Sequence, residues 1–224
     1  MIHAVNKLLA EYDVHLASAS PRRKNILNHV GMVFNITPSN FEENLDKKSF
    51  NHPRDYVVEN AKQKALEVMQ RLEKDDAKRK RFVIGTDTVV VAENQILEKP
   101  HTNENALNML LCLNRLKKHE VYSGVALVKS DTSGNTELRQ FYEMTQVEFG
   151  DIPEYVIKMY ADSAEPLDKA GAYGIQDVGG TLVSKIDGCY YNVEGFPLYK
   201  FCSEVYDWLA QPTATVVSKS DASN

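Results

Sequence analysis

The ten residues from Phe82 to Val91 (FVIGTDTVVV) constrain the fold of this chain more than any other stretch, because they are almost all apolar except at their centre. A run of this kind is typical of strands that are buried on both faces of a sheet. Asp87 lies in the middle of the run. An ionised carboxylate in such surroundings is strongly disfavoured unless it is paired or bound to a metal ion.

Gly85 precedes this aspartate and would allow the chain to bend, so we predict one strand over residues 82–84 and another over residues 89–91. The bend would bring Asp87 to a cleft at a strand end, where ligands bind in open α/β sheets. Asp87 is therefore a candidate metal ligand or general base. The alternative is that residues 85–88 form an Asx-type turn that only joins two hairpin strands.

Strand-like and helix-like segments alternate along the rest of the chain, which predicts an α/β fold. The other expected strands cover residues 14–17, 33–36, 96–97, 121–128, 141–149 and 182–186. The expected helices cover residues 21–30, with Gly31 as the stop, and residues 54–71, 105–116, 152–160 and 194–209. The charge run over residues 74–81 (KDDAKRKR) is interpreted as a solvated helix end or loop. We predict one domain over residues 1–211, followed by a disordered tail over residues 212–224.

Composition excludes several functional classes. The net charge of −5 argues against a general nucleic-acid binder. We expect no membrane association, because no apolar run reaches the roughly 20 residues that a membrane-spanning helix needs. The three cysteines are odd in number and far apart, which indicates a reducing, cytoplasmic location.

A second candidate site lies at Ser20-Pro21-Arg22-Arg23, where serine suits the N-cap of a helix and proline its first position. Both arginines then lie in the first turn, where the helix dipole disfavours cations. An anion bound in front of the helix would explain them, and the small residue Ser18 would let it approach the backbone. The alternative is an ordinary helix start with two surface arginines.

Two further stretches are candidates on weaker grounds. Lys99 follows a predicted strand and precedes proline, and taken alone it is a solvent-facing loop residue. Residues 168–176 (DKAGAYGIQ) are small, aromatic and amide-bearing, as a base-binding segment would be, although a glycine-rich connection explains them equally. We expect Tyr190 and Phe196 to pack in the core before the last helix.

Taken together and in order, these stretches resemble the Maf family of nucleotide pyrophosphatases. The matching segments are LASASPRR at 16–23, FEE at 41–43, AKQKA at 61–65, IGTDTVV at 84–90, LEKP at 97–100, SGVAL at 123–127, DKAGAYGIQ at 168–176 and YYNVEGFPL at 190–198. The resemblance covers residues 13–208. It implies an α/β fold similar to inosine triphosphate pyrophosphatases, with a mixed sheet and flanking helices in two lobes around a nucleotide cleft.

The resemblance also implies the chemistry. Family members split a nucleoside triphosphate into the monophosphate and pyrophosphate with a divalent cation, here expected to be Mg²⁺, with Mn²⁺ or Co²⁺ as alternatives. The expected catalytic residue is Asp87, the expected metal ligands are Glu43 and Asp87, and the expected substrate-binding residues are Ser18, Ser20, Arg22, Arg23, Lys64, Thr88, Lys99 and Gln176. Whether Glu42 or Glu43 faces the metal stays open. A homodimer is implied as well.

Three residues bear on the choice of base. Arg22, Thr88 and Gln176 resemble the dTTP/UTP-preferring subgroup rather than the subgroup associated with 7-methyl-GTP, which has tryptophan in place of the first arginine. Modified pyrimidine nucleotides fit the same pattern. The alternative function is a nucleotide-binding regulator of cell division without significant catalysis, but such a binder would not need two carboxylates, a metal and four cations together. A P-loop protein is excluded because the sequence contains no GxxxxGK[ST].

Overall fold

The computed structural model describes residues 1–75 and 79–210. The middle of the predicted charge run (76–78) and the predicted disordered tail (212–224) therefore lie outside the described residues. In the described part of the chain, no helix combines the length and the apolar character that a membrane crossing requires.

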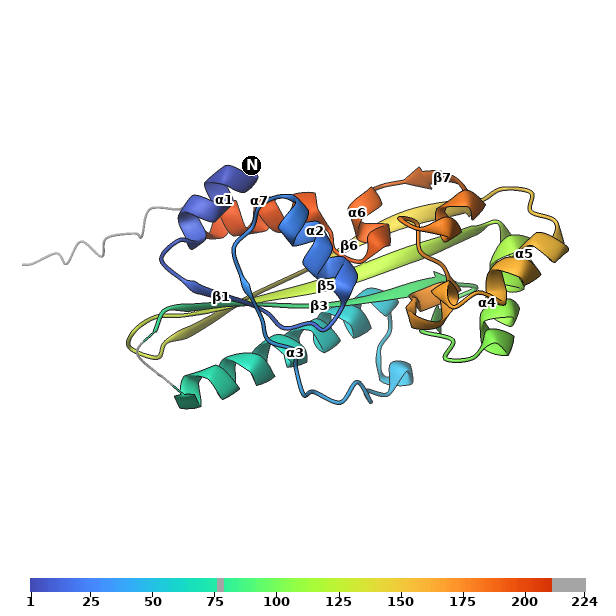
Figure 1. Ribbon diagram of the computed structural model, residues 1–224. Coiled ribbons are helices and arrows are strands. Elements are labelled where there is room, and N and C mark those ends of the chain that lie inside the picture. Colours follow the sequence, from blue (N-terminus) through green and yellow to red (C-terminus); the bar gives the residue numbers. More distant parts are fainter. Residues whose placement is uncertain (76–78, 211–224) are drawn as a thin grey trace, which may run out of the picture.

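The described residues form an α/β fold, as predicted, around a seven-stranded mixed sheet (Figure 1). The strands are β1 (Asp13–Leu16), β2 (Asn35–Ile36), β3 (Arg81–Ala92), β4 (Gln95–Leu97), β5 (Lys118–Ser130), β6 (Thr136–Phe149) and β7 (Val183–Asp187). The α-helices are α1 (Ile2–Leu9), α2 (Pro21–His29), α3 (Pro53–Asp75), α4 (Asn103–Leu116), α5 (Glu154–Ala161), α6 (Tyr190–Glu194) and α7 (Leu198–Leu209). Short 3-10 turns are η1 (Lys47–Ser49), η2 (Glu165–Asp168), η3 (Ala170–Ala172) and η4 (Val178–Leu182).

The sheet has the order β2-β1-β3-β5-β6-β7, and β4 pairs with β3 outside this path. One edge of β3 pairs with β5 along almost its whole length. Its other edge pairs in parallel with β1 at Arg81–Ile84 and antiparallel with β4 at Val90–Ala92. Within the described residues, positions 85–89 therefore have a strand partner on one side only. This gap in the sheet lies beside Asp87.

β3 is one continuous strand of 12 residues, so the predicted break into two strands with a bend at Gly85 is wrong. The glycine instead allows α3 and β3 to approach each other closely. A Cβ atom at Gly85 would lie 2.1 Å from the carbonyl oxygen of Ala61 and 2.8 Å from Cβ of Ala65, both on α3. Asp87 consequently lies in the middle of a strand rather than at a strand end or in a turn.

The two faces of the sheet are covered differently, because successive residues of a strand point to opposite faces. The long helix α3 covers one face, where Val83 and Val89 of β3 are fully or almost fully buried (Figure 1). The other face carries two separate cores. One lies under α1, α2 and α7 and contains Phe82, whereas the other lies under α4 and α5 and contains Val90. These two cores are the two lobes that the sequence predicts.

Between the two cores the same face of the sheet is polar. The hydroxyl groups of Thr88 on β3 and Ser123 on β5 lie 2.8 Å apart. Asn192 on α6 is fully buried and donates from its Nδ2 to Thr145 Oγ1 on β6, 3.0 Å away, and to the carbonyl oxygen of Val121, also 3.0 Å away. This polar band runs across the strands from the gap beside Asp87.

Apart from the strand break at Gly85, most predicted elements agree with the structure except at their ends, but two elements and one predicted core residue do not. The predicted helix over 194–209 is two helices, because Gly195 has a φ of 122° and ends α6, and Pro197 precedes the start of α7. The second strand is limited to residues 35–36, the two positions that pair with β1, and Val33 lies outside it and is 84% exposed. Phe196 is fully buried as expected, but Tyr190 is 41% exposed and does not pack in the core.

Candidate functional site

A cavity of about 330 Å³ lies at the gap in the sheet, and a second cavity of about 220 Å³ adjoins it. The two cavities share Ser20, Arg22, Arg23, Glu43, Lys64 and Lys99 in their walls. Asp87, Thr88 and Gln176 line the larger cavity, and Ser18 lines the smaller one. The structure therefore brings together every residue that the sequence singled out for binding, catalysis or metal ligation.

Lys64 joins the two predicted metal ligands. Its Nζ lies 2.7 Å from Oε2 of Glu43 and 2.9 Å from Oδ1 of Asp87. Lys64 and Asp87 are almost completely buried, whereas about half of the Glu43 side chain is exposed. The neighbouring Glu42 instead accepts a hydrogen bond from Asn44 at 3.4 Å. Of the two adjacent glutamates, Glu43 is thus the one whose carboxylate lies in the site.

The same lysine is placed by the packing of α3. Ala61 and Ala65 of this helix lie directly on Gly85, and Lys64 lies between them in the sequence. Residues of β3 alternate between the two faces, so Asp87 shares the face of Gly85 and points toward α3. The close packing of helix and strand therefore sets the distance between the ammonium group and the carboxylate.

The two carboxylates differ in their acidity. Burial raises the pKa of Asp87 above its usual value, the charge of Lys64 opposes this rise, and the charge of Glu43 adds to it. Burial acts in the same direction on Glu43, but the ion pair with Lys64 and the charge of Arg23 together hold the pKa of Glu43 below its usual value. Such a divided pair of carboxylates is typical of sites in which one group accepts a proton and the other stays ionised.

Arg23 is held on the opposite face of β3. Its guanidinium group donates to Ser18 Oγ at 3.1 Å, to Thr88 Oγ1 at 3.1 Å and to the carbonyl oxygen of Gly195 at 3.0 Å. Ser20 is the N-cap residue of α2, as predicted, although its hydroxyl group caps no backbone N–H. The helix start thus carries a fixed arginine that borders both cavities.

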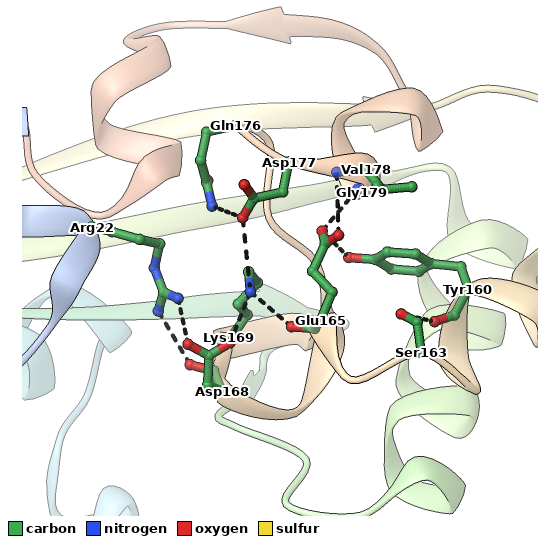
Figure 2. A network of polar contacts seen from close by, with 10 residues as sticks. All are labelled: Arg22, Tyr160, Ser163, Glu165, Asp168, Lys169, Gln176, Asp177, Val178 and Gly179. Carbon is green, nitrogen blue, oxygen red and sulfur yellow. Dashed lines mark hydrogen bonds and ion pairs between the residues drawn. The ribbon is translucent and has the colours of Figure 1, made fainter. Parts of the chain in front are cut away.

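Arg22 reaches across the cleft to the opposite wall (Figure 2). Its guanidinium group donates to Oδ2 of Asp168 at 2.9 Å and to the carbonyl oxygen of Asp168 at 3.1 Å. The other carboxylate oxygen of Asp168 lies 2.8 Å from Nζ of the buried Lys169. Residues 22 and 168 belong to the two different lobes, so this ion pair links them directly.

Lys99 differs from the other cations of the site. It is exposed, it borders both cavities, and its Nζ has no hydrogen-bond or ion-pair partner among the residues that the structure describes. The preceding Glu98 also lines the larger cavity and accepts hydrogen bonds from Tyr56 at 2.9 Å and Lys47 at 2.6 Å. Lys99 is therefore available to an anionic ligand.

Sequence reasoning missed several residues of the site. Four of them lie in segments that match the family, although the sequence indicates no role for any of them: Glu98, Asp168, Lys169 and Asn192. For Lys169 the only local signal is the adjacent Asp168, whose carboxylate pairs with it at 2.8 Å. For Glu98 the sequence offers no such signal, since its partners Tyr56 and Lys47 come from distant segments.

The donor atoms fit a hard divalent cation that takes part of its ligands from a nucleotide. Mg²⁺ is commonly held by one or two carboxylates together with substrate phosphates and water. Glu43 and Asp87 supply two such carboxylates beside the cation-rich wall. No cluster of three or more histidine, cysteine, aspartate or glutamate residues suited to a metal ion exists within the described ranges 1–75 and 79–210.

Comparison with known proteins gives close relatives along nearly the whole chain. A family model described as Maf-like protein matches residues 13–208. A human protein described as a probable bifunctional dTTP/UTP pyrophosphatase/methyltransferase is 46% identical over 204 residues, which are 90% of this chain and 32% of that protein. A dTTP/UTP pyrophosphatase from Lachnoclostridium phytofermentans is 39% identical over 194 residues, 87% of this chain and 94% of that protein.

The chain thus spans about a third of the human relative and nearly all of the bacterial one. Among solved structures, a nucleoside-triphosphatase (dITP/XTP pyrophosphatase) from Mycobacterium abscessus is similar over 86% of this chain and 92% of its own length, with 13% identity and a TM-score of 0.37.

Proposed function

Because the chain belongs to the Maf family, we propose that it is a nucleoside triphosphate pyrophosphatase that splits dTTP and UTP into the monophosphate and pyrophosphate. The substrate class follows from the relatives that carry this activity in their descriptions. Modified pyrimidine nucleotides that keep the base edge and the triphosphate belong to the same class.

One observation carries the proposal. A buried carboxylate with a raised pKa, Asp87, is held by Lys64 at the wall of a cavity that five lysine and arginine side chains border. The main barrier to the attack of water on a triphosphate is its negative charge, which fixed cations offset. A buried aspartate beside those cations is suited to take the proton from the attacking water.

Each residue of the site has a separate role in the proposed hydrolysis. Asp87 accepts a proton from the water that attacks the α-phosphorus, and the bond between this phosphorus and the bridging oxygen breaks as pyrophosphate leaves. Lys64 keeps the Asp87 carboxylate oriented through the 2.9 Å contact. Arg23 and Lys99 bind phosphate oxygens, the first as a donor held in place by its hydrogen bonds and the second as a donor without a partner among the described residues.

Glu43 and Asp87 would hold the divalent cation, for which we propose Mg²⁺. When bound, such an ion neutralises phosphate charge and polarises the phosphoryl group. Because we assign only these two carboxylates to the cation, its remaining ligands would be phosphate oxygens and water. Chelation by EDTA should abolish turnover, and added Mg²⁺ should restore it.

The decisive variant is Asp87→Asn, which keeps the shape of the side chain and removes its ability to accept a proton. We expect the release of pyrophosphate from dTTP to fall by about a hundredfold or more, the usual contribution of a general base. Asp162→Asn, at the exposed end of α5, is the matched control and should leave turnover unchanged. Turnover in Asp87→Asn within about threefold of the unaltered protein would remove this residue from the role of base.

The same assay separates an enzyme from a nucleotide-binding regulator. An enzyme gives pyrophosphate with the unaltered protein, and its Asp87→Asn variant still binds dTTP in calorimetry while turnover is lost. A regulator binds dTTP equally well in both forms and releases no pyrophosphate from either.

The oligomeric state and the location of the protein are further parts of the proposal. We propose a homodimer that acts in the cytoplasm on free nucleotides and not on nucleic acid. The negative net charge of −5 and the three free cysteines support this setting. Light scattering at micromolar concentration tests the oligomeric state.

A further inference from the structure

Only one of the two polar atoms in the side-chain amide of Gln176 has a hydrogen-bond partner among the described residues. Its Nε2 donates to Oδ2 of Asp177 at 2.6 Å (Figure 2). Its Oε1 has almost no exposed surface and no hydrogen-bond partner among the described residues, and the residue as a whole belongs to the wall of the larger cavity. A buried acceptor without a partner is unfavourable, and native proteins retain few of them. An unpartnered acceptor on a residue of the cavity wall points to a ligand that donates to it.

Asp177 determines which end of the amide is unsatisfied. An ionised carboxylate can only accept hydrogen bonds, so it can pair with the NH₂ group of a glutamine but not with its carbonyl oxygen. Rotation of the Gln176 amide by half a turn would place two oxygens against each other at the present 2.6 Å. The contact therefore holds the carbonyl oxygen on the side away from Asp177.

The surroundings keep both partners in place. The buried Lys169 lies 3.9 Å from Oδ2 of Asp177 and 2.7 Å from the carbonyl oxygen of Glu165. Both side chains pack closely on Gly174, because a Cβ atom there would lie 2.6 Å from Cε of Lys169 and 2.8 Å from Nε2 of Gln176. The amide thus rests against a glycine and a buried lysine, with its orientation set by one carboxylate.

We propose that Asp177 is a positioning residue for base selection, because it holds Oε1 of Gln176 as an acceptor for a ring N–H group of the base. Uracil and thymine carry such a group at N3, whereas N3 of cytosine has a lone pair and accepts instead. The fixed amide therefore favours the pyrimidines whose ring nitrogen donates. This inference rests on the proposed function, since it concerns the base of the same triphosphate.

The first test needs no substitution. 3-Methyl-UTP differs from UTP only in that a methyl group replaces the N3–H, so the unaltered protein should hydrolyse it at least about tenfold less efficiently, in kcat/KM, than UTP. Near-equal efficiency for the two nucleotides would overturn the proposal, because no donor to Oε1 would then be needed.

The second test changes which side chain of the Gln176–Asp177 pair can donate the hydrogen bond. Asp177→Asn lets the neighbouring side chain pair with either end of the Gln176 amide, so the ratio of kcat/KM for UTP over CTP should fall by about tenfold. In the double variant Gln176→Glu with Asp177→Asn, the asparagine donates to one oxygen of the new carboxylate and leaves the other as an acceptor. The ratio should then recover toward that of the unaltered protein.

This recovery distinguishes positioning from a merely structural role, which would reduce turnover of UTP and CTP alike and would not be rescued. Asp187→Asn on β7 is the matched control, because this exposed carboxylate has no side-chain partner in the described part of the chain. A UTP/CTP ratio in Asp177→Asn within about twofold of the unaltered protein would contradict the proposal.

Failure of the proposed function gives a different result. If the unaltered protein releases no pyrophosphate from any nucleotide, the enzyme assignment fails, and calorimetric binding of UTP, CTP and 3-methyl-UTP replaces turnover as the measurement. The inference then stands if UTP binds at least about tenfold more tightly than the other two, and it falls if the three bind equally or not at all.

Discussion

His119 is buried at the start of β5 in the core under α4 and α5, and its Nε2 lies 2.8 Å from the hydroxyl group of Tyr173. The rings of Phe149 and Tyr173 pack edge-on against the imidazole. Within the described residues, Nδ1 has no hydrogen-bond partner. Burial lowers the pKa of His119 from its ordinary 6.5 to about 4, so this histidine is neutral at physiological pH.

The sign of the resulting pH dependence follows from the unfolded state. Below pH 6.5 the unfolded chain binds a proton at His119, whereas the folded protein binds this proton only below about pH 4. The free energy of unfolding should therefore decrease between these two values, by a total of about 3 kcal/mol, and no further below pH 4 on account of this residue. Urea unfolding at a series of pH values measures this loss.

His119→Gln provides the comparison, since glutamine can still reach Tyr173 but does not titrate. Its free energy of unfolding should be lower at pH 7.5, because the ring packing is lost, but should depend less steeply on pH between 6.5 and 4. Equal slopes for the two proteins would show that His119 is not the source of the acid sensitivity.

Single residues were predictable from the sequence where the chemistry is local. The apolar run around Asp87 indicates a buried carboxylate, and the structure buries it. The partner of Asp87 was not derivable from the run itself, because Lys64 belongs to a helix 23 positions away and reaches the site only through packing. The orientation of Gln176 was equally inaccessible, since it depends on how residues 174–177 fold back on themselves.

At the scale of elements, the contact between α3 and the sheet rests on two glycines. A Cβ atom at Gly85 on β3 would lie 2.1 Å from the carbonyl oxygen of Ala61, and one at Gly124 on β5 would lie 2.4 Å from the carbonyl oxygen of Val57. Both obstacles are helix backbone, which cannot rotate away as a side chain does. The helix lies close to the sheet because these two positions carry no side chain.

Gly85→Ala should therefore push α3 away from β3. We expect the free energy of unfolding to fall by about 1–3 kcal/mol, as overpacked cores show, and turnover to fall as well because Lys64 moves with the helix away from Asp87. Gly150→Ala is the matched control, since a Cβ atom there meets its nearest neighbour at an ordinary 3.6 Å. Loss of stability with unchanged turnover would show that the glycine does not set the Lys64 position.

The elements themselves were largely predictable, because periodicity and capping residues are local signals. The prediction fails at Gly85, where a glycine in a strand has two physical uses: it permits a bend, or it permits close approach. Only the position of α3 over the sheet decides between them, and that position is a long-range property. The split at Gly195 and Pro197 is the opposite case, because the glycine ends one helix, the proline precedes the start of the next, and both signals are local.

At the scale of the whole molecule, two cores share one sheet. β3, β5 and β6 each contribute residues to the core under α1, α2 and α7 and to the core under α4 and α5. The polar band between these cores forms the floor of the cleft, and the ion pair of Arg22 with Asp168 spans it. Two lobes are therefore compatible with one cooperative unit, as the predicted single domain over residues 1–211 requires.

Cooperative unfolding is the measurable consequence. Trp208, the single tryptophan of the chain, packs against Phe82 and reports the first core, whereas hydrogen exchange of peptides from α4 reports the second. In urea both signals should give one midpoint, because neither core can unfold without disrupting the shared strands.

A non-hydrolysable dTTP analogue with Mg²⁺, at about 100 times its Kd, should raise the free energy of unfolding by about 2.7 kcal/mol in both signals. Earlier loss of protection in α4, or stabilisation of one signal alone, would mean that the lobes unfold separately and that the nucleotide contacts only one of them.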